Sequence, residues 1–227
     1  MQVESYLKVI GEEYGESFEK FKDILLDYNN KFNLTAITDE KGIYIKHFLD
    51  SVAGESFIKR GSNVVEIGSG GGFPSIPLKI IRGDLSFTLV ESTGKKCDYL
   101  KAVVDKLNLN CVKVINARAE EAAKLPLYRE KFDYAVARAV AKLNTLSEYC
   151  LPFVKTGGRF IAYKSCNTEE VKQAEKAIAV LGGELERIEN YVLPGGEVHS
   201  LIIIKKVART PEKYPRGQGK ERKCPIS

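Results

Sequence analysis

The chain has 227 residues, a length that suits one α/β domain with an extension better than two full domains. Apolar residues make up 44% and charged residues 29%, which allows a sizeable core, and no apolar run is long enough to cross a bilayer. The start lacks a signal-peptide pattern, the five cysteines form no CxxC pair and the two histidines have no metal-ligand spacing, so we expect a cytoplasmic protein with free thiols and no metal.

The N-terminal region has the periodicity of amphipathic helices. Apolar residues recur at steps of three and four between Leu7 and Tyr28, and Gly11 and Gly15 can divide this stretch into two helices. Asparagines at 29, 30 and 33 predict a loop, and apolar spacing predicts a further helix over 41–58. Residues 1–58 are therefore predicted to form a helical extension.

From Asn63 onward, short apolar runs alternate with segments of helical periodicity. The runs are Val64–Ile67, Phe87–Val90, Val112–Ile115, Tyr134–Ala137, Phe160–Tyr163 and Leu201–Ile204. This alternation predicts a mainly parallel sheet covered on both faces. Residues 184–192 and 198–206 flank a turn too short for a crossover helix, so the last strand should be antiparallel. We expect a Rossmann-like α/β core with a seven-stranded, mostly parallel sheet over residues 59–207.

A glycine-rich segment, residues 68–72, follows the first predicted strand and precedes a helix. Gly68 and Gly70 allow a tight turn and close approach of a ligand to the backbone. Dinucleotide-binding loops need glycine or alanine where this chain has Phe73. Glu66 precedes the loop and would repel a pyrophosphate, whereas it would attract the ammonium and sulfonium of S-adenosylmethionine. The loop favours S-adenosylmethionine over NAD.

The ends of the next strands supply further candidate cofactor contacts. Glu91 ends the second strand, where a carboxylate can accept both ribose hydroxyls, although a surface glutamate is the alternative. Ala119 and Glu120 follow the third strand and can border the adenine, with a backbone group or the Glu120 carboxylate meeting its exocyclic amine, although Glu120 could simply begin a helix. Arg138 ends the fourth strand and is expected to point into the crevice, where it could bind or position a ligand.

Motifs that are absent at the fourth strand narrow the choice of methyl acceptor. No Asn/Asp-Pro-Pro-Tyr segment of amino-group methyltransferases is present, Cys150 and Cys166 have no catalytic setting, and Asp133 lies at the wrong end for ribose methylation. Guanine N7 has an in-plane lone pair and no proton, so its methylation needs no general base. We therefore expect no catalytic base, while other soft nucleophiles remain open. In A-form RNA the N7 edge is inaccessible, so the target should be unpaired.

The C-terminal region is strongly basic. Residues 205–227 carry a net charge of +6, compared with +5 for the whole chain. This asymmetry predicts a polyanionic partner, with a merely solvated tail as the alternative. The predicted RNA contacts in the tail, residues 208–227, are Arg209, Lys213, Arg216, Lys220, Arg222 and Lys223.

Several motifs together resemble one known family. They are Asn33–Ile37, His47–Ser51, Gly68–Lys79, Ser92–Lys96, Phe132-Asp133 with Arg138–Ala141, and Lys213–Arg216. The chain is similar in these segments to the bacterial small-subunit ribosomal RNA guanine-N7 methyltransferases, also called glucose-inhibited division protein B. The resemblance covers the chain from about Phe18 to the tail.

The resemblance implies a class I methyltransferase fold with S-adenosylmethionine as cofactor and a guanine in the decoding-region loop of 16S rRNA, or of the small subunit, as substrate. It places cofactor contacts at Gly68, Phe73, Glu91, Ser92, Thr93, Ala119, Glu120 and Arg138. His47, Asp50 and Lys164 match positions that the family tends to fill in the same way, and we assign Lys164 to RNA binding. Two departures are Ser75, where glycine is usual, and Lys220-Glu221, where the family's tail has a proline.

Three alternatives remain open. The chain could methylate another RNA, a protein or a small molecule, in which case the basic tail would be dispensable. It could be a non-catalytic RNA-binding relative without cofactor affinity. A nicotinamide-dependent oxidoreductase is disfavoured by Glu66 and Phe73. We expect a monomer without membrane association.

Overall fold

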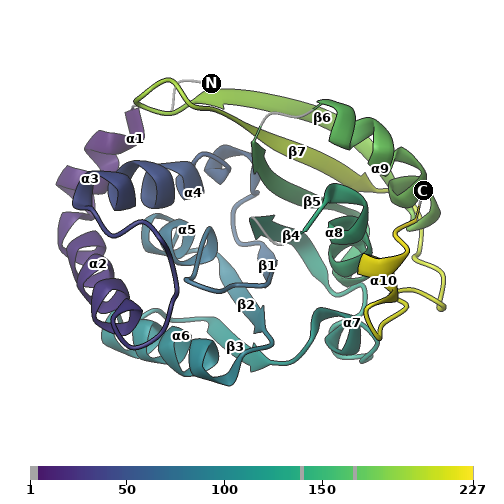
Figure 1. Ribbon diagram of the computed structural model, residues 1–227, viewed down its shortest axis with the longest axis horizontal. Helices are drawn as coiled ribbons and strands as arrows, with labels where there is room; N and C mark the ends of the chain where they lie inside the picture. The colour runs from purple at the N-terminus through teal and green to yellow at the C-terminus, as the bar shows by residue number, and fades with distance from the viewer. Residues whose placement is uncertain (1–4, 139–140, 166–167, 227) are drawn as a thin grey trace.

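The computed structural model describes residues 5–138, 141–165 and 168–226. A seven-stranded sheet runs through the centre in the order β3-β2-β1-β4-β5-β7-β6 (Figure 1). The strands are β1 (Asn63–Ile67), β2 (Ser86–Glu91), β3 (Val112–Asn116), β4 (Phe132–Arg138), β5 (Val154–Ser165), β6 (Gly183–Val192) and β7 (Val198–Lys206).

The first five strands are parallel, and β7 is antiparallel to both β5 and β6. The turn between β6 and β7 is closed by hydrogen bonds between Leu193 and Glu197 and between Gly196 and Leu193. The predicted Rossmann-like class I fold with an antiparallel last strand is therefore confirmed.

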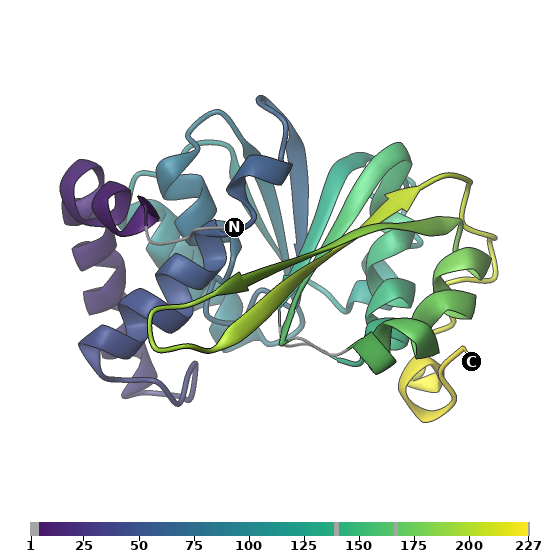
Figure 2. The same cartoon turned by 90° about the horizontal axis from the view of Figure 1, so that it is seen from above.

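Helices cover both faces of the sheet, as Figure 2 shows with the sheet nearly edge-on. One face is covered by α2 (Gly15–Asn29), α5 (Ser75–Ile81), α6 (Gly94–Lys106) and the helical stretch formed by α3 (Glu40–Gly42), a π-helical segment (Ile43–Leu49) and α4 (Asp50–Val52). The other face is covered by α7 (Ala119–Ala122), α8 (Leu143–Cys150) and α9 (Thr168–Val180). Each face has its own apolar core because the strands are buried on both sides.

The N-terminal region is helical, and it is interrupted near Gly11 and Gly15, where the sequence predicted a break. α1 (Ser5–Lys8) continues into a π-helical turn, Val9–Glu13, and α2 begins at Gly15. Phe18 and Phe21 of α2 are fully buried and pack against Phe48, which joins the extension to the core. The helix predicted over 41–58 runs from residue 40 to 52, and a short 3-10 turn, Glu55–Phe57, follows it.

The C-terminal segment returns to the body of the protein. Residues 207–226 run beside α7 and α8, and α10 (Lys220–Lys223) lies against α8 (Figure 1). The guanidinium of Arg129 donates hydrogen bonds to the carbonyls of Thr210 and Tyr214, at 2.9 Å each. The basic tail is thus a folded part of the domain.

Candidate functional site

The glycine loop, residues 68–72, links the carboxyl end of β1 to α5. Gly68 and Gly72 have φ angles of 71° and 87°, which residues with a Cβ rarely adopt. A Cβ on Gly72 would also lie 2.7 Å from Cγ1 of Ile76. The Gly68 amide donates to the carbonyl of Val90 at 2.9 Å, so the loop bends toward the end of β2. The shape of this loop requires glycine.

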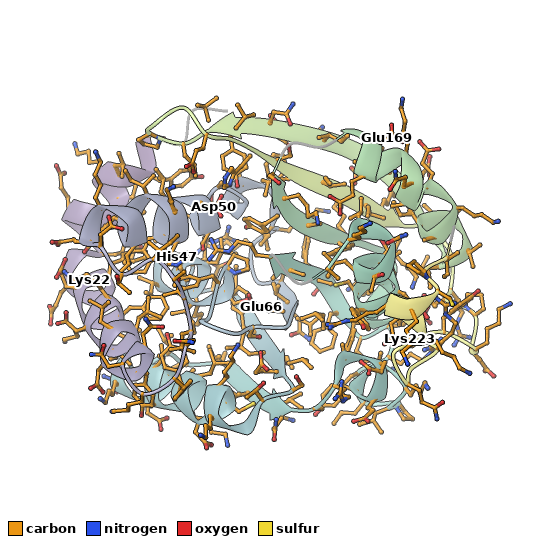
Figure 3. The ribbon with its side chains drawn as sticks, in the orientation of Figure 1. Lys22, His47, Asp50, Glu66, Glu169 and Lys223 are labelled. Carbon is orange, nitrogen blue, oxygen red and sulfur yellow. The ribbon has the colours of Figure 1, made fainter. Side chains whose placement is uncertain are left out.

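Glu66, on β1, is a fully buried carboxyl group at the centre of the molecule (Figure 3). Among the described residues, no hydrogen bond of ordinary geometry reaches either of its oxygens. Burial raises the pKa of Glu66 to about 8, and the nearby Ser75 and the Arg138 guanidinium offset only part of that rise. A buried carboxyl group that lacks a well-formed hydrogen bond is an open position for a positively charged ligand group.

Glu91, at the end of β2, is buried and holds the glycine loop. One carboxylate oxygen accepts from the Gly70 amide at 3.0 Å, and the other accepts from the Thr93 amide at 2.8 Å. A carboxylate oxygen can accept more than one hydrogen bond, so both oxygens retain acceptor capacity. Glu91 therefore orders the loop and can still accept hydroxyl donors.

A cavity of about 300 Å³ opens beside Gly68 at the carboxyl ends of the first three strands. We call it the Gly68 cavity, and its lining residues are Ile67, Gly68, Val90, Ser92, Ala117, Arg118, Ala119, Glu120, Tyr149, Gly219, Glu221 and Arg222. Four of the predicted cofactor residues, Gly68, Ser92, Ala119 and Glu120, are among them. Sequence reasoning missed the wall made by α8 and the C-terminal segment.

Arg138, at the end of β4, is held by groups of the helical extension. Its guanidinium donates to Oδ2 of Asp50 at 2.8 Å and to the carbonyl of Lys46 at 3.1 Å, and lies 3.1 Å from Nδ1 of His47. It also lies over the ring of Phe73, 4.8 Å from the centroid. Phe73 thus contacts Arg138 and stacks on His47 at 4.4 Å, and is not among the described residues lining the Gly68 cavity.

His47 is neutral in this arrangement. Because arginine cannot accept a hydrogen bond, Nδ1 of His47 must be the acceptor and Nε2 carries the proton. Nε2 lies 2.7 Å from Oγ1 of Thr35, which accepts the hydrogen bond that the Nε2–H group donates. Burial, together with the Arg138 charge, lowers the pKa of His47 to about 4.

Asp50 is the buried anion that joins these groups. Its Oδ1 accepts from the hydroxyl of Tyr191 at 2.6 Å and lies 2.7 Å from Nδ1 of His199. Burial would raise its pKa, but the His199 hydrogen bond and the Arg138 charge hold the pKa of Asp50 below its usual range. The Asp50 hydrogen bond in turn raises the pKa of His199. Tyr191 and His199 face each other in the β6-β7 register, a pairing that the predicted hairpin could have indicated.

A second cavity, of about 370 Å³, opens beside Arg138. We call it the Arg138 cavity, and its lining residues are Ile37, Lys46, His47, Asp50, Arg138, Tyr163, Lys164, Ser165, Glu197 and His199. Apart from the neutral His47, its basic side chains have carboxylate partners. The pairs are Lys46 with Glu197 (2.6 Å), Lys164 with Glu170 (2.7 Å), and Arg138 and His199 with Asp50. The cavity is therefore polar but close to charge balance.

The predicted RNA-binding residues fall into two groups. Arg216 is bound by the buried carboxylate of Glu148, to which its backbone amide, Nε and Nη2 donate at 2.8, 3.0 and 2.7 Å. Lys164, Arg209 and Arg222 also have internal partners, namely Glu170, Glu130 and the Tyr149 hydroxyl. The side chains of Lys213, Lys220 and Lys223 are exposed, and Figure 3 places Lys223 far from His47 and Asp50.

Over the described ranges, no group of three or more His, Cys, Asp or Glu side chains could hold a metal ion. No described helix is long and apolar enough to span a membrane. Cys97 and Cys150 are buried free thiols and Cys111 and Cys224 are exposed free thiols, while Cys166, together with Ala139 and Val140 of the quoted motif, lies outside the described residues.

Residues 15–198 match the GidB family, described as rRNA small subunit methyltransferase G. The chain belongs to this family. Among curated relatives, the ribosomal RNA small subunit methyltransferase G of Clostridium novyi strain NT is 47% identical over 213 residues, covering 92% of this chain and 88% of that protein. The protein of the same name from Acetivibrio thermocellus is 44% identical over 220 residues, covering 96% and 91%.

Solved structures of low identity share the fold. M. jannaschii TYW2 in complex with AdoMet superimposes with a TM-score of 0.59 at 17% identity and covers 76% of this chain and 80% of that one. A precorrin-6y C5,15-methyltransferase from Geobacter metallireducens gives a TM-score of 0.52 at 14% identity, over 70% and 87%.

Membership of the GidB family confirms the predicted family, the S-adenosylmethionine-dependent methyltransferase activity and the rRNA substrate. It excludes the oxidoreductase alternative. The individual cofactor and RNA contacts, the division into three segments and the monomeric state stay predictions.

Proposed function

We propose that this chain transfers a methyl group to N7 of an unpaired guanine in the decoding-region loop of 16S rRNA. The observation that carries the proposal is the charge balance of the Arg138 cavity next to Glu66. Each cation that lines this cavity has a carboxylate partner, so the cavity favours a neutral group over a phosphate. A nucleobase is neutral, and N7 of guanine accepts a methyl group without a base to remove a proton.

Two of the groups that could act as a base in this cavity, His47 and Asp50, are already committed to other contacts. Both nitrogens of His47 and both carboxylate oxygens of Asp50 have partners. Guanine N7 has a free lone pair and no proton, so it accepts a methyl group without proton removal. The remaining task of the protein is to hold the base in line and to exclude water, for which the Arg138-Phe73-His47 stack provides a fixed wall.

The donor would be held between the two cavities. S-adenosylmethionine, when bound, supplies an electrophilic methyl group on a sulfonium. Glu66, whose oxygens receive no hydrogen bond of ordinary geometry from the described residues, would ionise and balance a positive charge of the donor. Glu91 would use its remaining acceptor capacity for the ribose hydroxyls, and Ala119 and Glu120 would border the adenine in the Gly68 cavity.

RNA would be held mainly by exposed lysines. Lys213, Lys220 and Lys223 are exposed on the C-terminal segment and can reach phosphates without breaking an ion pair. We place this activity in the cytoplasm, with a monomeric enzyme and either free 16S rRNA or the small subunit as substrate. The net charge of +5 favours association with such a polyanion.

The test is a methyl-transfer assay with labelled S-adenosylmethionine and three acceptors: 16S rRNA, small subunits and transcripts of the decoding-region loop. Label is expected at one guanine that becomes sensitive to the chemical cleavage specific for N7-methylguanine. Gly68→Val serves as a control that blocks backbone approach to the cofactor. Label at another atom of the base, in protein, or at no position would refute the proposal.

A further inference from the structure

The C-terminal strap, residues 210–226, forms one wall of the Gly68 cavity. Three of its residues, Gly219, Glu221 and Arg222, line the cavity opposite the strand ends. In Figure 1 the strap lies between α7 and α8, and α10 closes that side of the sheet. A segment that looks like a basic RNA-binding arm in the sequence therefore also shapes the cofactor site.

Buried polar contacts hold the strap in place. Glu148 is fully buried and binds Arg216 through three donors, and the hydroxyl of Thr145 donates to the carbonyl of Glu221 at 2.9 Å. Between these anchors, residues 217–219 have φ angles of 82°, 58° and 74°, a run of left-handed backbone that turns the chain back toward the cavity. The position of Glu221 is thus fixed by the fold.

Glu221 has an incomplete set of hydrogen bonds. Its side chain is fully buried, and one carboxylate oxygen, Oε1, accepts from the hydroxyl of Tyr149 at 2.9 Å. The other, Oε2, has no partner among the described residues. Leaving a buried carboxylate oxygen without a donor is unfavourable, so a donor from a ligand in the cavity would be favoured there. Such an oxygen indicates a neutral N–H or O–H donor or a cation.

The residues that line the Gly68 cavity indicate which part of the cofactor would lie near Glu221. Ser92, beside Glu91, is at the end where the ribose is proposed, and Ala119 and Glu120 are at the adenine end. The strap packs against this adenine end, because a Cβ on Gly217 would lie 3.6 Å from Cγ of Glu120. The exocyclic amine of adenine is the N–H donor of the cofactor that belongs at this end.

We propose that Glu221 is a specificity-determining residue that accepts a hydrogen bond from the exocyclic amine of the cofactor's adenine. The inference rests on the proposed placement of the adenosine in the Gly68 cavity. Glu221 lies in the part of the tail where the resembled family has a proline, so the contact would be a feature of this chain and not of the family as a whole. Tyr149 keeps Oε1 occupied, which leaves Oε2 for the ligand.

The test compares S-adenosylhomocysteine with its inosine counterpart, in which a carbonyl replaces the amine. Titration calorimetry measures the dissociation constants of both ligands for the wild type, Glu221→Ala, Glu221→Gln and the control Glu212→Ala, an exposed glutamate of the same strap. The wild type is expected to prefer the adenosine ligand by about tenfold or more, in the range of one charged hydrogen bond. Glu221→Ala should reduce that preference to about twofold or less, chiefly by lowering the affinity for the adenosine ligand.

Glu221→Gln keeps the size of the side chain and brings an amide donor, so it should also lose the preference and bind the inosine ligand better than the wild type does. Glu212→Ala should bind both ligands as the wild type does. If Glu221→Ala and Glu221→Gln weaken both ligands equally, Glu221 only holds the strap and the inference is wrong. If the wild type binds neither ligand, the placement of the cofactor itself fails, which is a different result.

Discussion

Replacing Glu66 with glutamine is expected to remove a large pH dependence from the stability of the ligand-free protein. Burial raises the pKa of this carboxyl group from 4.5 to about 8. Between these two pH values the folded protein keeps a proton on Glu66 that the unfolded chain releases. The contribution of Glu66 to the free energy of unfolding is therefore greatest below pH 4.5 and is lost as the pH rises through 8. Between pH 6 and pH 9 this single group should lower the free energy of unfolding by about 3 kcal/mol.

The assay is urea-induced unfolding of the wild type and Glu66→Gln at several pH values in this window. Only the difference between the two variants is informative, because the buried Lys206 titrates in the same window with the opposite sign: burial lowers its pKa to about 8, which favours the folded state as the pH rises. Glu121→Gln, at an exposed glutamate, is the matched control and should leave the pH dependence unchanged.

A second measurement ties this carboxyl group to the cofactor. Below pH 8 the wild type must release the Glu66 proton to bind a cation there, so its affinity for S-adenosylmethionine should rise with pH between 6 and 7.5, and Glu66→Gln should bind weakly without this rise. If both variants have parallel stability curves and parallel affinity curves, Glu66 is not the protonated, cation-accepting group inferred from its burial.

Three further substitutions test other parts of the site. Glu91→Ala removes the acceptor of the Gly70 amide and should weaken the binding of S-adenosylmethionine, measured by calorimetry, by about 10- to 100-fold. An unchanged dissociation constant would contradict the ribose assignment. Arg138→Lys cannot keep the forked contacts of the guanidinium, so turnover should fall at least about tenfold, and unchanged turnover would contradict a positioning role for Arg138. The double substitution Lys213→Glu and Lys223→Glu should reduce the slope of log RNA affinity against log salt by about 1 to 2 without affecting cofactor binding, whereas an unchanged slope would place RNA elsewhere.

The sheet could be predicted because its determinants are local. Apolar runs of four residues, separated by helical periodicity, are sufficient to define parallel strands, and the five-residue turn before Val198 is sufficient to define the antiparallel hairpin. The glycine loop is equally local, since its left-handed backbone is required within five residues. The ligand side of such a sheet follows from its topology, so the residues at the strand ends could be named in advance.

Contacts between distant parts of the chain could not be predicted in the same way. The partners of Asp50 are 88 to 149 residues away along the chain, and Arg216 is 68 residues from Glu148. Periodicity indicates which face of a helix or strand is buried, but it does not indicate which charged side chains form ion pairs with each other. The contacts of the Phe73 ring with Arg138 and His47 are of this kind, and the cofactor contact that the family resemblance implies for Phe73 stays a prediction.

Net charge is a poor guide to which cations are available for RNA. The tail segment counts as strongly positive in the sequence, yet Arg216 is bound by the buried Glu148, and the exposed Arg209 and Arg222 each have one contact within the protein. When only the tail cations without such contacts among the described residues are counted, the positive charge available to RNA lies on the exposed Lys213, Lys220 and Lys223 of the strap. The same pairing leaves the Arg138 cavity near neutrality, because a cation that already has a carboxylate partner attracts a phosphate weakly. We therefore expect the two kinds of surface to separate the tasks that an RNA methyltransferase must combine, with exposed lysines binding the charged backbone and a balanced, polar cavity accepting one uncharged base.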